Sequence, residues 1–322
     1  MQKKRLPAPR ASDPVEWPTL ALLAGCYLVW SIAVLGGGPI WASVPALAIA
    51  VALHGSLTHE AIHGHPFRDP RWNAAAVWPA LSVVLPYGRF RDTHLAHHRD
   101  ALLTDPYDDP ESNYLDPAVW TRLPWPVRAV LRANNTLLGR MALGPAIGTG
   151  VFLVGDLRLA LRDRAVRRAW LAHLPAAAAV LALVAVAPMP FWAYAAGVYL
   201  GLSLLRIRTF LEHQAHARAR ARTVIVEDRG PLALLFLNNN LHVVHHMHPR
   251  VPWYRLPAVY AAQRDRYLAR NDGYVYRSYG EVFRRYLLAP KDPVPHPLWR
   301  RGAAAAPPLP VAAVGSPDEV RG

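Results

Sequence analysis

Two long apolar segments without charged side chains dominate the pattern of this chain. Residues 17–59 and 169–205 contain no Asp, Glu, Lys or Arg, over 43 and 37 positions. One bilayer crossing takes roughly 20 apolar residues, so each segment is long enough for two crossings and too long for a core helix of a soluble protein. Turn residues interrupt both segments near the middle, with Gly-Gly-Gly-Pro at 36–39 and Pro-Met-Pro at 188–190. The pattern predicts an all-α integral membrane protein with four transmembrane helices in two hairpins, at about residues 17–35, 40–59, 169–187 and 190–208.

Two weaker apolar stretches lie between the hairpins, at 72–88 and 141–155. Prolines interrupt the first stretch, and glycines and a proline interrupt the second. If both stretches crossed the membrane, the seven arginines from Arg89 to Arg140 would lie outside, against the distribution of charge described next. We therefore predict that both stretches are interfacial or re-entrant.

The basic residues are distributed as in an inner-membrane protein. Four Lys and Arg precede the first hairpin, 14 lie between the hairpins and 18 follow the second, while the two hairpin turns have none. This arrangement predicts that both termini and the middle segment are cytoplasmic. The net charge of +14 then suits anionic membrane lipids, and nucleic-acid binding is disfavoured.

The predicted organisation has three parts. Residues 1–16 form a cytoplasmic tail, residues 17–300 form the membrane domain with a cytoplasmic helical cap, and the Ala/Pro-rich residues 301–322 form a disordered tail. The single cysteine, Cys26, excludes a disulfide framework and a thiolate metal site. "LLAGC" resembles a lipoprotein cleavage site, but the apolar run continues past Cys26, which favours a membrane span.

Histidines are concentrated in four short segments. Twelve of the 15 fall in "HEAIHGH" (59–65), "HLAHH" (94–98), "HQAH" (213–216) and "HVVHHMH" (242–248). For the other three we expect a satisfied polar group in the bundle (His54), an interfacial group (His173) and a surface residue (His296). Within the segments, the i, i+3 and i, i+4 spacings place imidazoles on one face of a helix.

The predicted topology brings all four histidine segments to the cytoplasmic side. A zinc site uses about four ligands, so eight or nine imidazoles indicate two metal ions, although imidazole binds Zn, Cu, Fe and Ni alike. "HEAIH" alone matches the zinc-peptidase pattern, in which Glu60 would be the general base. A non-catalytic metal-binding membrane protein is a further alternative.

The set H-x3-H, H-x2-H-H, H-x2-H-H on two hairpins resembles the membrane fatty acid desaturase and hydroxylase superfamily of non-haem di-iron enzymes. The resemblance runs from about residue 54 to 260 and is closest to bacterial fatty acid desaturases, through "HEAIHGHP", "HLAHH", "LTDPYDDPESNY", "RTFLEH", "RTVIVE" and "LLFLNNNLHVVHHMHPRVPWYRLP". It implies two iron ions held by His59, His63, His94, His97, His98, His213, His242, His245 and His246. His216 is an alternative to His213.

Other residues are candidates for the surroundings of the metal site. A histidine ligand usually donates its second N–H to a carboxylate or carbonyl oxygen. The candidates near the boxes are Glu60, Asp105, Asp109, Glu212, Asn239 and Asn240. His65 and His248 are expected in the second layer or at the rim.

The resemblance implies an O2-dependent oxidoreductase that inserts a double bond into an acyl lipid. The alternative on the same scaffold is a lipid or carotenoid hydroxylase or ketolase, and a zinc metallopeptidase is less favoured. Because no haem-binding "HPGG" motif occurs in the chain, we expect a separate electron donor such as a ferredoxin, docked on the basic cytoplasmic face.

Overall fold

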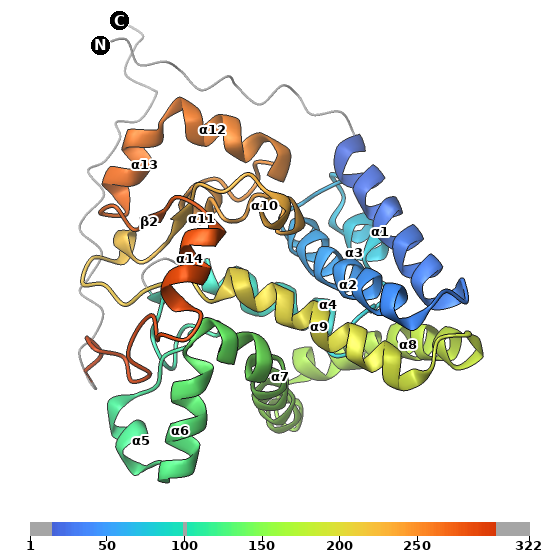
Figure 1. Ribbon diagram of the computed structural model, residues 1–322, viewed down its shortest axis with the longest axis horizontal. Helices are drawn as coiled ribbons and strands as arrows, with labels where there is room; N and C mark the ends of the chain where they lie inside the picture. Colours follow the sequence, from blue (N-terminus) through green and yellow to red (C-terminus); the bar gives the residue numbers. More distant parts are fainter. Residues whose placement is uncertain (1–14, 99–101, 301–322) are drawn as a thin grey trace, which may run out of the picture.

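The computed structural model describes residues 15–98 and 102–300, which are predominantly helical (Figure 1). The predicted tails at 1–16 and 301–322 therefore lie outside the described residues, except Val15 and Glu16. The long helices are α1 (Trp17–Leu35), α2 (Ile40–Ile62), α7 (Leu137–Ala160), α8 (Arg164–Val186) and α9 (Phe191–Thr209). The shorter ones in the first half are α3 (Pro70–Ala76), α4 (Tyr87–His97), α5 (Pro117–Arg122) and α6 (Trp125–Asn134).

The second half beyond α9 builds a cap of short elements. They are η2 (Ala219–Ala221), α10 (Pro231–Leu235), α11 (His242–Met247), η3 (Trp253–Arg255), α12 (Leu256–Ala262), α13 (Arg264–Arg270) and α14 (Tyr279–Tyr286). The strands β1 (Ile225–Val226) and β2 (Val275–Tyr276) pair in parallel, with Ile225 opposite Val275. Figure 1 shows this cap beside the end of α2.

The membrane helices confirm the predicted fold class. Among the described residues, four helices are long and apolar enough to cross a membrane, namely α1, α2, α7 and α8. α1 and α2 form the first predicted hairpin, and Gly37 adopts φ +67° in its turn, which glycine accommodates without strain. α2 packs so closely on α9 that a Cβ at Gly197 would collide with Leu47, and one at Gly201 with Val51.

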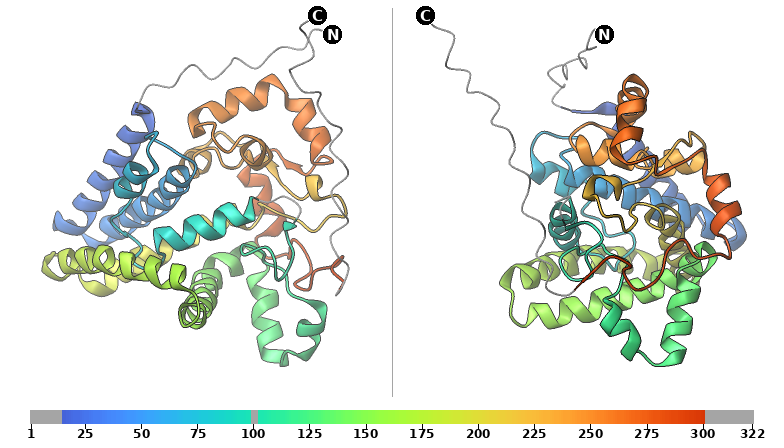
Figure 2. Two further views of the ribbon diagram at one scale, coloured as in Figure 1. Left: turned by 180° about the vertical axis from the view of Figure 1, so that it is seen from behind. Right: turned by 90° about the vertical axis from the view of Figure 1, so that its left-hand side faces the viewer.

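In the stretch 141–155 the glycines and the proline do not interrupt the helix. Pro145 lies inside α7, a continuous helix of 24 residues. α9 occupies the range predicted for the fourth span, but it is not among the four most apolar helices, since Arg206 and Arg208 lie in its last turn. α7 crosses α8 and α9 at a steep angle (Figure 2). α7 is long and apolar enough to cross a membrane, and its interfacial position stays a prediction.

The stretch 72–88 takes a re-entrant path. After α3 the chain leaves helical geometry, and Leu81 packs with Val180 and Ala193 in the interior of the bundle. The Tyr194 hydroxyl, in the first turn of α9, donates to the Leu81 carbonyl at 2.6 Å. Since α9 rises 1.5 Å per residue, this contact lies roughly 20 Å from the end of α9 that leads to His213. α4 then returns the chain to the histidine end.

Candidate metal centre

Nine predicted histidines meet at one end of the helix bundle. The last turn of α2 provides two, the end of α4 three, the turn after α9 one, and α11 three. The i, i+3 and i, i+4 spacings place the imidazoles of each helix on one face, as the sequence predicted. They form two groups, in each of which the potential ligand nitrogens lie within 4.8 Å of one another.

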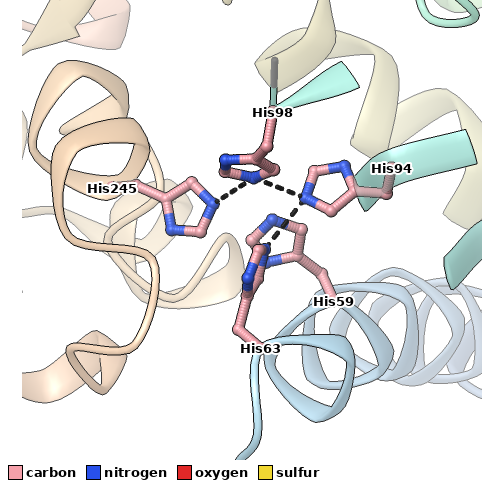
Figure 3. Close-up of side chains that lie close together, drawn as sticks. All are labelled: His59, His63, His94, His98 and His245. Carbon is pink, nitrogen blue, oxygen red and sulfur yellow. Dashed lines mark hydrogen bonds between the residues drawn. The ribbon is translucent and has the colours of Figure 1, made fainter. Parts of the chain in front are cut away.

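The first cluster joins α2, α4 and α11 (Figure 3). It consists of His59, His63, His94, His98 and His245. Nε2 of His94 lies 3.0 Å from Nε2 of both His63 and His98, and Nε2 of His98 lies 3.2 Å from Nε2 of His245. Nε2 of His59 is buried and has no hydrogen-bond partner among the described residues.

The second cluster joins α4, the segment after α9 and α11. It consists of His97, His213, His242 and His246. Nε2 of His213 is the centre of the group, 2.8 Å from Nε2 of His97 and 3.2 Å from Nε2 of His242. The clusters are adjacent, because the rings of His98 and His246 stack with centroids 4.3 Å apart.

Carboxylate and amide oxygens accept the outer ring N–H of three histidines. Nδ1 of His97 donates to Asp109 at 2.7 Å, and Nδ1 of His94 donates to Glu111 at 2.9 Å. Nδ1 of His242 donates to the Asn239 side-chain oxygen at 3.0 Å. These acceptors fix the ring orientation and the tautomer.

The donor set fits bound metal. A neutral imidazole carries one proton, so a ring whose Nδ1–H donates presents an unprotonated Nε2. In their neutral forms, His94, His97 and His242 therefore direct lone pairs at other imidazole nitrogens at 2.8–3.2 Å. Burial lowers the pKa of His97, but Glu111 and Asp109 outweigh it and raise this pKa to about 9, so a bound metal would have to displace the proton from this ring. Two nitrogens bound to one metal at about 2.1 Å and at right angles lie about 3.0 Å apart. Lone pairs that face one another repel, and a metal cation bound between the rings would remove this repulsion by accepting them as ligands.

Burial keeps these ligands available. It lowers the pKa of the His213, His242 and His245 imidazoles well below the usual range, and neighbouring imidazoles lower it further. These rings are therefore neutral near pH 7, the form that binds metal.

Four of the other candidates lie beside the clusters. Asp109 and Asn239 contact imidazoles as described above, and a Glu212 oxygen lies 3.9 Å from Nδ1 of His242. Glu212 also forms an ion pair with Arg208 at 2.9 Å. A Glu60 oxygen lies 3.7 Å from Nδ1 of His59, and the Glu60 carboxylate also accepts the Trp253 N–H at 3.2 Å.

The structure places three candidates away from the clusters. Asp105 caps the turn at Tyr107 and accepts the indole N–H of Trp299 at 3.0 Å. Asn240 donates to the Val226 carbonyl, which ties it to β1 rather than to a ring. His216 accepts the Arg218 N–H at 3.1 Å, so His213 is the histidine of "HQAH" that reaches the second cluster.

The remaining histidines have other partners. Nδ1 of His65 lies 2.8 Å from a carboxylate oxygen of Glu16. The ring centroids of His248 and Tyr267 lie 6.2 Å apart. His54 is buried and lies 3.3 Å from the Tyr27 hydroxyl, consistent with the expected satisfied polar group. His296 is not a surface residue, because it is buried and contacts the Thr104 hydroxyl at 3.1 Å.

Sequence reasoning missed Glu111. It lies 17 residues after His94, but the turn that begins at Asp105 brings it back to α4. Burial alone would raise the pKa of this carboxyl group, whereas the adjacent His97 and His94 lower it below the usual range. The available signal was the acidic run "DPYDDPE", which begins seven residues after the second histidine box and includes Glu111 as well as Asp105 and Asp109.

An apolar cavity of about 380 Å³ ends beside the first cluster. This proximal cavity lies between α2, α4, α8, α9 and the re-entrant segment. Thr58, which precedes His59, and Phe90, whose ring centroid is 5.7 Å from that of His94, line it on the side of the histidines. A long apolar molecule in this cavity would therefore present one end to the first cluster.

The fold and the site define a class: a helical membrane protein with two clusters of histidines at one end of its bundle. The chain belongs to the fatty acid desaturase family, whose family model matches residues 37–279 and so includes all nine histidines. It is also similar to the β-carotene ketolase of Paracoccus sp. (strain N81106 / MBIC 01143), with 30% identity over 229 residues, which cover 69% of this chain and 76% of the relative. The protein is thus an oxidoreductase of the desaturase and oxygenase superfamily.

Proposed function

We propose that this protein binds two non-haem iron ions and uses O2 to oxidise a C–H bond of a carotenoid, converting a ring methylene into an alcohol or a ketone. The observation that carries this proposal is the apolar cavity that reaches Thr58 and Phe90, the residues that separate it from the first histidine cluster. The similarity to a β-carotene ketolase supports the choice of substrate.

The number and arrangement of the imidazoles favour two metal ions. A zinc peptidase would need one metal and leave Glu60 free as a base. Here nine imidazoles form two groups, and Glu60 accepts the Trp253 N–H. Iron held by these nine rings would supply the activation of O2 that an unactivated C–H bond requires.

The chain itself orients the ligands and the lipid. Asp109 and Glu111 keep the ring protons on Nδ1 of His97 and His94, so that each Nε2 faces inward. Phe90 and Thr58 stand between the proximal cavity and the first cluster, where they limit the approach of a substrate carbon. The apolar walls keep water from the reacting end.

The reaction requires electrons from outside the chain. Insertion of one oxygen atom, which gives the alcohol, consumes O2, two electrons and two protons, and releases one water. Oxidation of the alcohol to the ketone consumes a second O2, two more electrons and two more protons, and releases two waters, one of them by loss from the geminal diol. A separate donor such as a ferredoxin would supply the electrons at the cytoplasmic face of the cell inner membrane. The net charge of +14 supports an acidic donor.

Acyl-lipid desaturation is the second candidate. The match to the fatty acid desaturase family over residues 37–279 favours it, and the same cavity suits an acyl chain. The candidates differ in product, because desaturation leaves a new double bond and no new oxygen.

Expression in a host that makes β-carotene and has a known lipid composition distinguishes these candidates. We expect oxygenated carotenoids in cells with the wild-type protein and none with His245→Ala, measured by liquid chromatography and mass spectrometry. New acyl double bonds without carotenoid products would favour desaturation. Purified protein with about one zinc and no iron would contradict both candidates, and a wild type that binds metal without any product would indicate a non-catalytic protein.

A further inference from the structure

The re-entrant segment between α3 and α4 reaches deep into the bundle and turns at Leu81–Val83, which we call the tip. Non-helical backbone at membrane depth is stable only where protein covers it or where it lines a cavity. Both conditions hold here, because Leu81 is 1% exposed and the tip lines the proximal cavity.

Two side chains hold the tip in place. The Tyr194 hydroxyl donates to the Leu81 carbonyl at 2.6 Å, and Nε2 of His173 donates to the Val83 carbonyl at 3.1 Å. Val83 has φ +55°, a costly conformation for a β-branched residue, which the surrounding contacts must maintain. The tip is therefore a positioned wall rather than a passive connection.

A second cavity of about 380 Å³ lies on the other side of the tip. This distal cavity is lined by α7, α8 and α9, with apolar residues such as Pro145, Leu181 and Phe191. Ser82 of the tip and Leu202 of α9 line both cavities, so the two spaces adjoin at this pair of residues.

We propose that the tip and Leu202 determine substrate length: a long lipid passes between Ser82 and Leu202, and its distal part occupies the distal cavity. This inference rests on the proposed oxidation of a lipid at the first cluster. Both cavities have apolar linings, they share Ser82 and Leu202 as lining residues, and the proximal one reaches Thr58 and Phe90. Tyr194 and His173 are positioning residues in this arrangement.

The test compares two substrates with the same ring and different chain lengths, β-carotene and retinyl acetate. Leu202→Trp fills the passage, so we expect the ratio of β-carotene to retinyl acetate oxidation to fall at least about tenfold, the scale on which pockets discriminate small changes in size. Leu202→Ala widens the passage and should raise the same ratio. Tyr194→Phe frees the tip and should change the ratio while the iron content stays at the wild-type level.

Leu200→Trp is the matched control, because Leu200 is on the same helix but 46% exposed. It should keep the wild-type ratio. An unchanged ratio in Leu202→Trp, or an equal loss of both activities, would overturn the inference. If the wild type oxidises neither substrate, the carotenoid proposal fails, and the same ratio is then measured for new double bonds in long and short acyl chains of the host.

Discussion

Both histidine clusters take residues from α4 and α11, but the third segment that provides histidines differs between them. The first cluster takes His59 and His63 from the end of α2, a helix long and apolar enough to span the membrane. The second takes His213 from the turn after α9, where the chain enters the cap. One cluster is thus attached to a membrane helix, and the other to the cap.

Their hydrogen-bonded surroundings differ as well. In the second cluster, the His97 and Asp109 side chains are 1% and 2% exposed, and Asn239 holds His242. In the first, Glu111 beside His94 is 28% exposed. The carboxylate that supports the second cluster is therefore the more buried of the two, while the first cluster adjoins the proximal cavity. This difference suggests that the first cluster faces the substrate and the second anchors the pair.

The largest expected effects come from removing one ligand from each cluster. His245→Ala and His242→Ala are a matched pair, because both residues lie in α11 one turn apart and belong to different clusters. Each should lower product formation at least about 100-fold, since even groups that only support a metal ligand cost 10–100-fold. Iron analysis should show about one ion lost in each variant.

The same two variants also test whether the two clusters bind metal independently. If His242→Ala loses both ions and His245→Ala only one, metal binding at the first cluster requires the second cluster. Retention of both ions and of activity in either variant would contradict the assignment of that histidine as a ligand. Circular dichroism should show wild-type helix content in both proteins.

Carboxylates that hold the ligands should have the next largest effect. Asp109→Asn and Glu111→Gln keep the size of each side chain but remove its charge. We expect a loss of activity or metal affinity of about 10–100-fold, larger for the more buried Asp109. Metal affinity measured by competition with a chelator tests the order, and a larger effect of Glu111→Gln would reverse the proposed ranking of the clusters.

Helical spacing explains why the histidines were predictable. His59 and His63, or His94, His97 and His98, share a face in any α-helix, so local geometry is sufficient. The first hairpin was predictable for the same kind of reason, because length and apolarity indicate a span. The same criteria select α8 but not α9 in the second hairpin, and they also select α7, for which the sequence predicted an interfacial or re-entrant position. The choice of His213 over His216 rested on the family resemblance, and the structure places only His213 in a cluster.

Tertiary contacts account for what could not be predicted. Glu111 reaches His94 because of how one turn folds back, and Asp105, equally acidic, bonds instead to Trp299 from the end of the described chain. Pro145 and its neighbouring glycines continue as helix α7 because tertiary packing overrides local propensity. The depth of the re-entrant tip depends on Tyr194, more than 100 residues away.

A smaller effect is expected from the pH dependence of metal-free protein. His97 and His94 hold the pKa of Glu111 below its usual range against the opposing effect of burial. A carboxylate with a lowered folded-state pKa stabilises the fold above its ordinary pKa, and this contribution is lost as pH falls. Chelated wild type should therefore exceed Glu111→Gln in Tm by about 2–4 °C near pH 7, and the difference should shrink in acid. A difference that grows as pH falls would show that Glu111 is not held in this way.

The smallest effect should come from replacing His216, which is close to His213 in sequence but does not belong to the second cluster. His216→Ala removes contacts with Arg218 and with Asp272, the latter 3.9 Å away, and no ring of either cluster. Such surface substitutions change stability by about 0.5 kcal/mol or less, so iron content and product formation should remain near the wild-type values. His213→Ala, three residues earlier, should lose about one iron ion and most activity, because Nε2 of His213 contacts both His97 and His242. Equal losses in the two variants would mean that His216 reaches the second cluster when metal is bound, and the cap would then have to rearrange around the segment after α9.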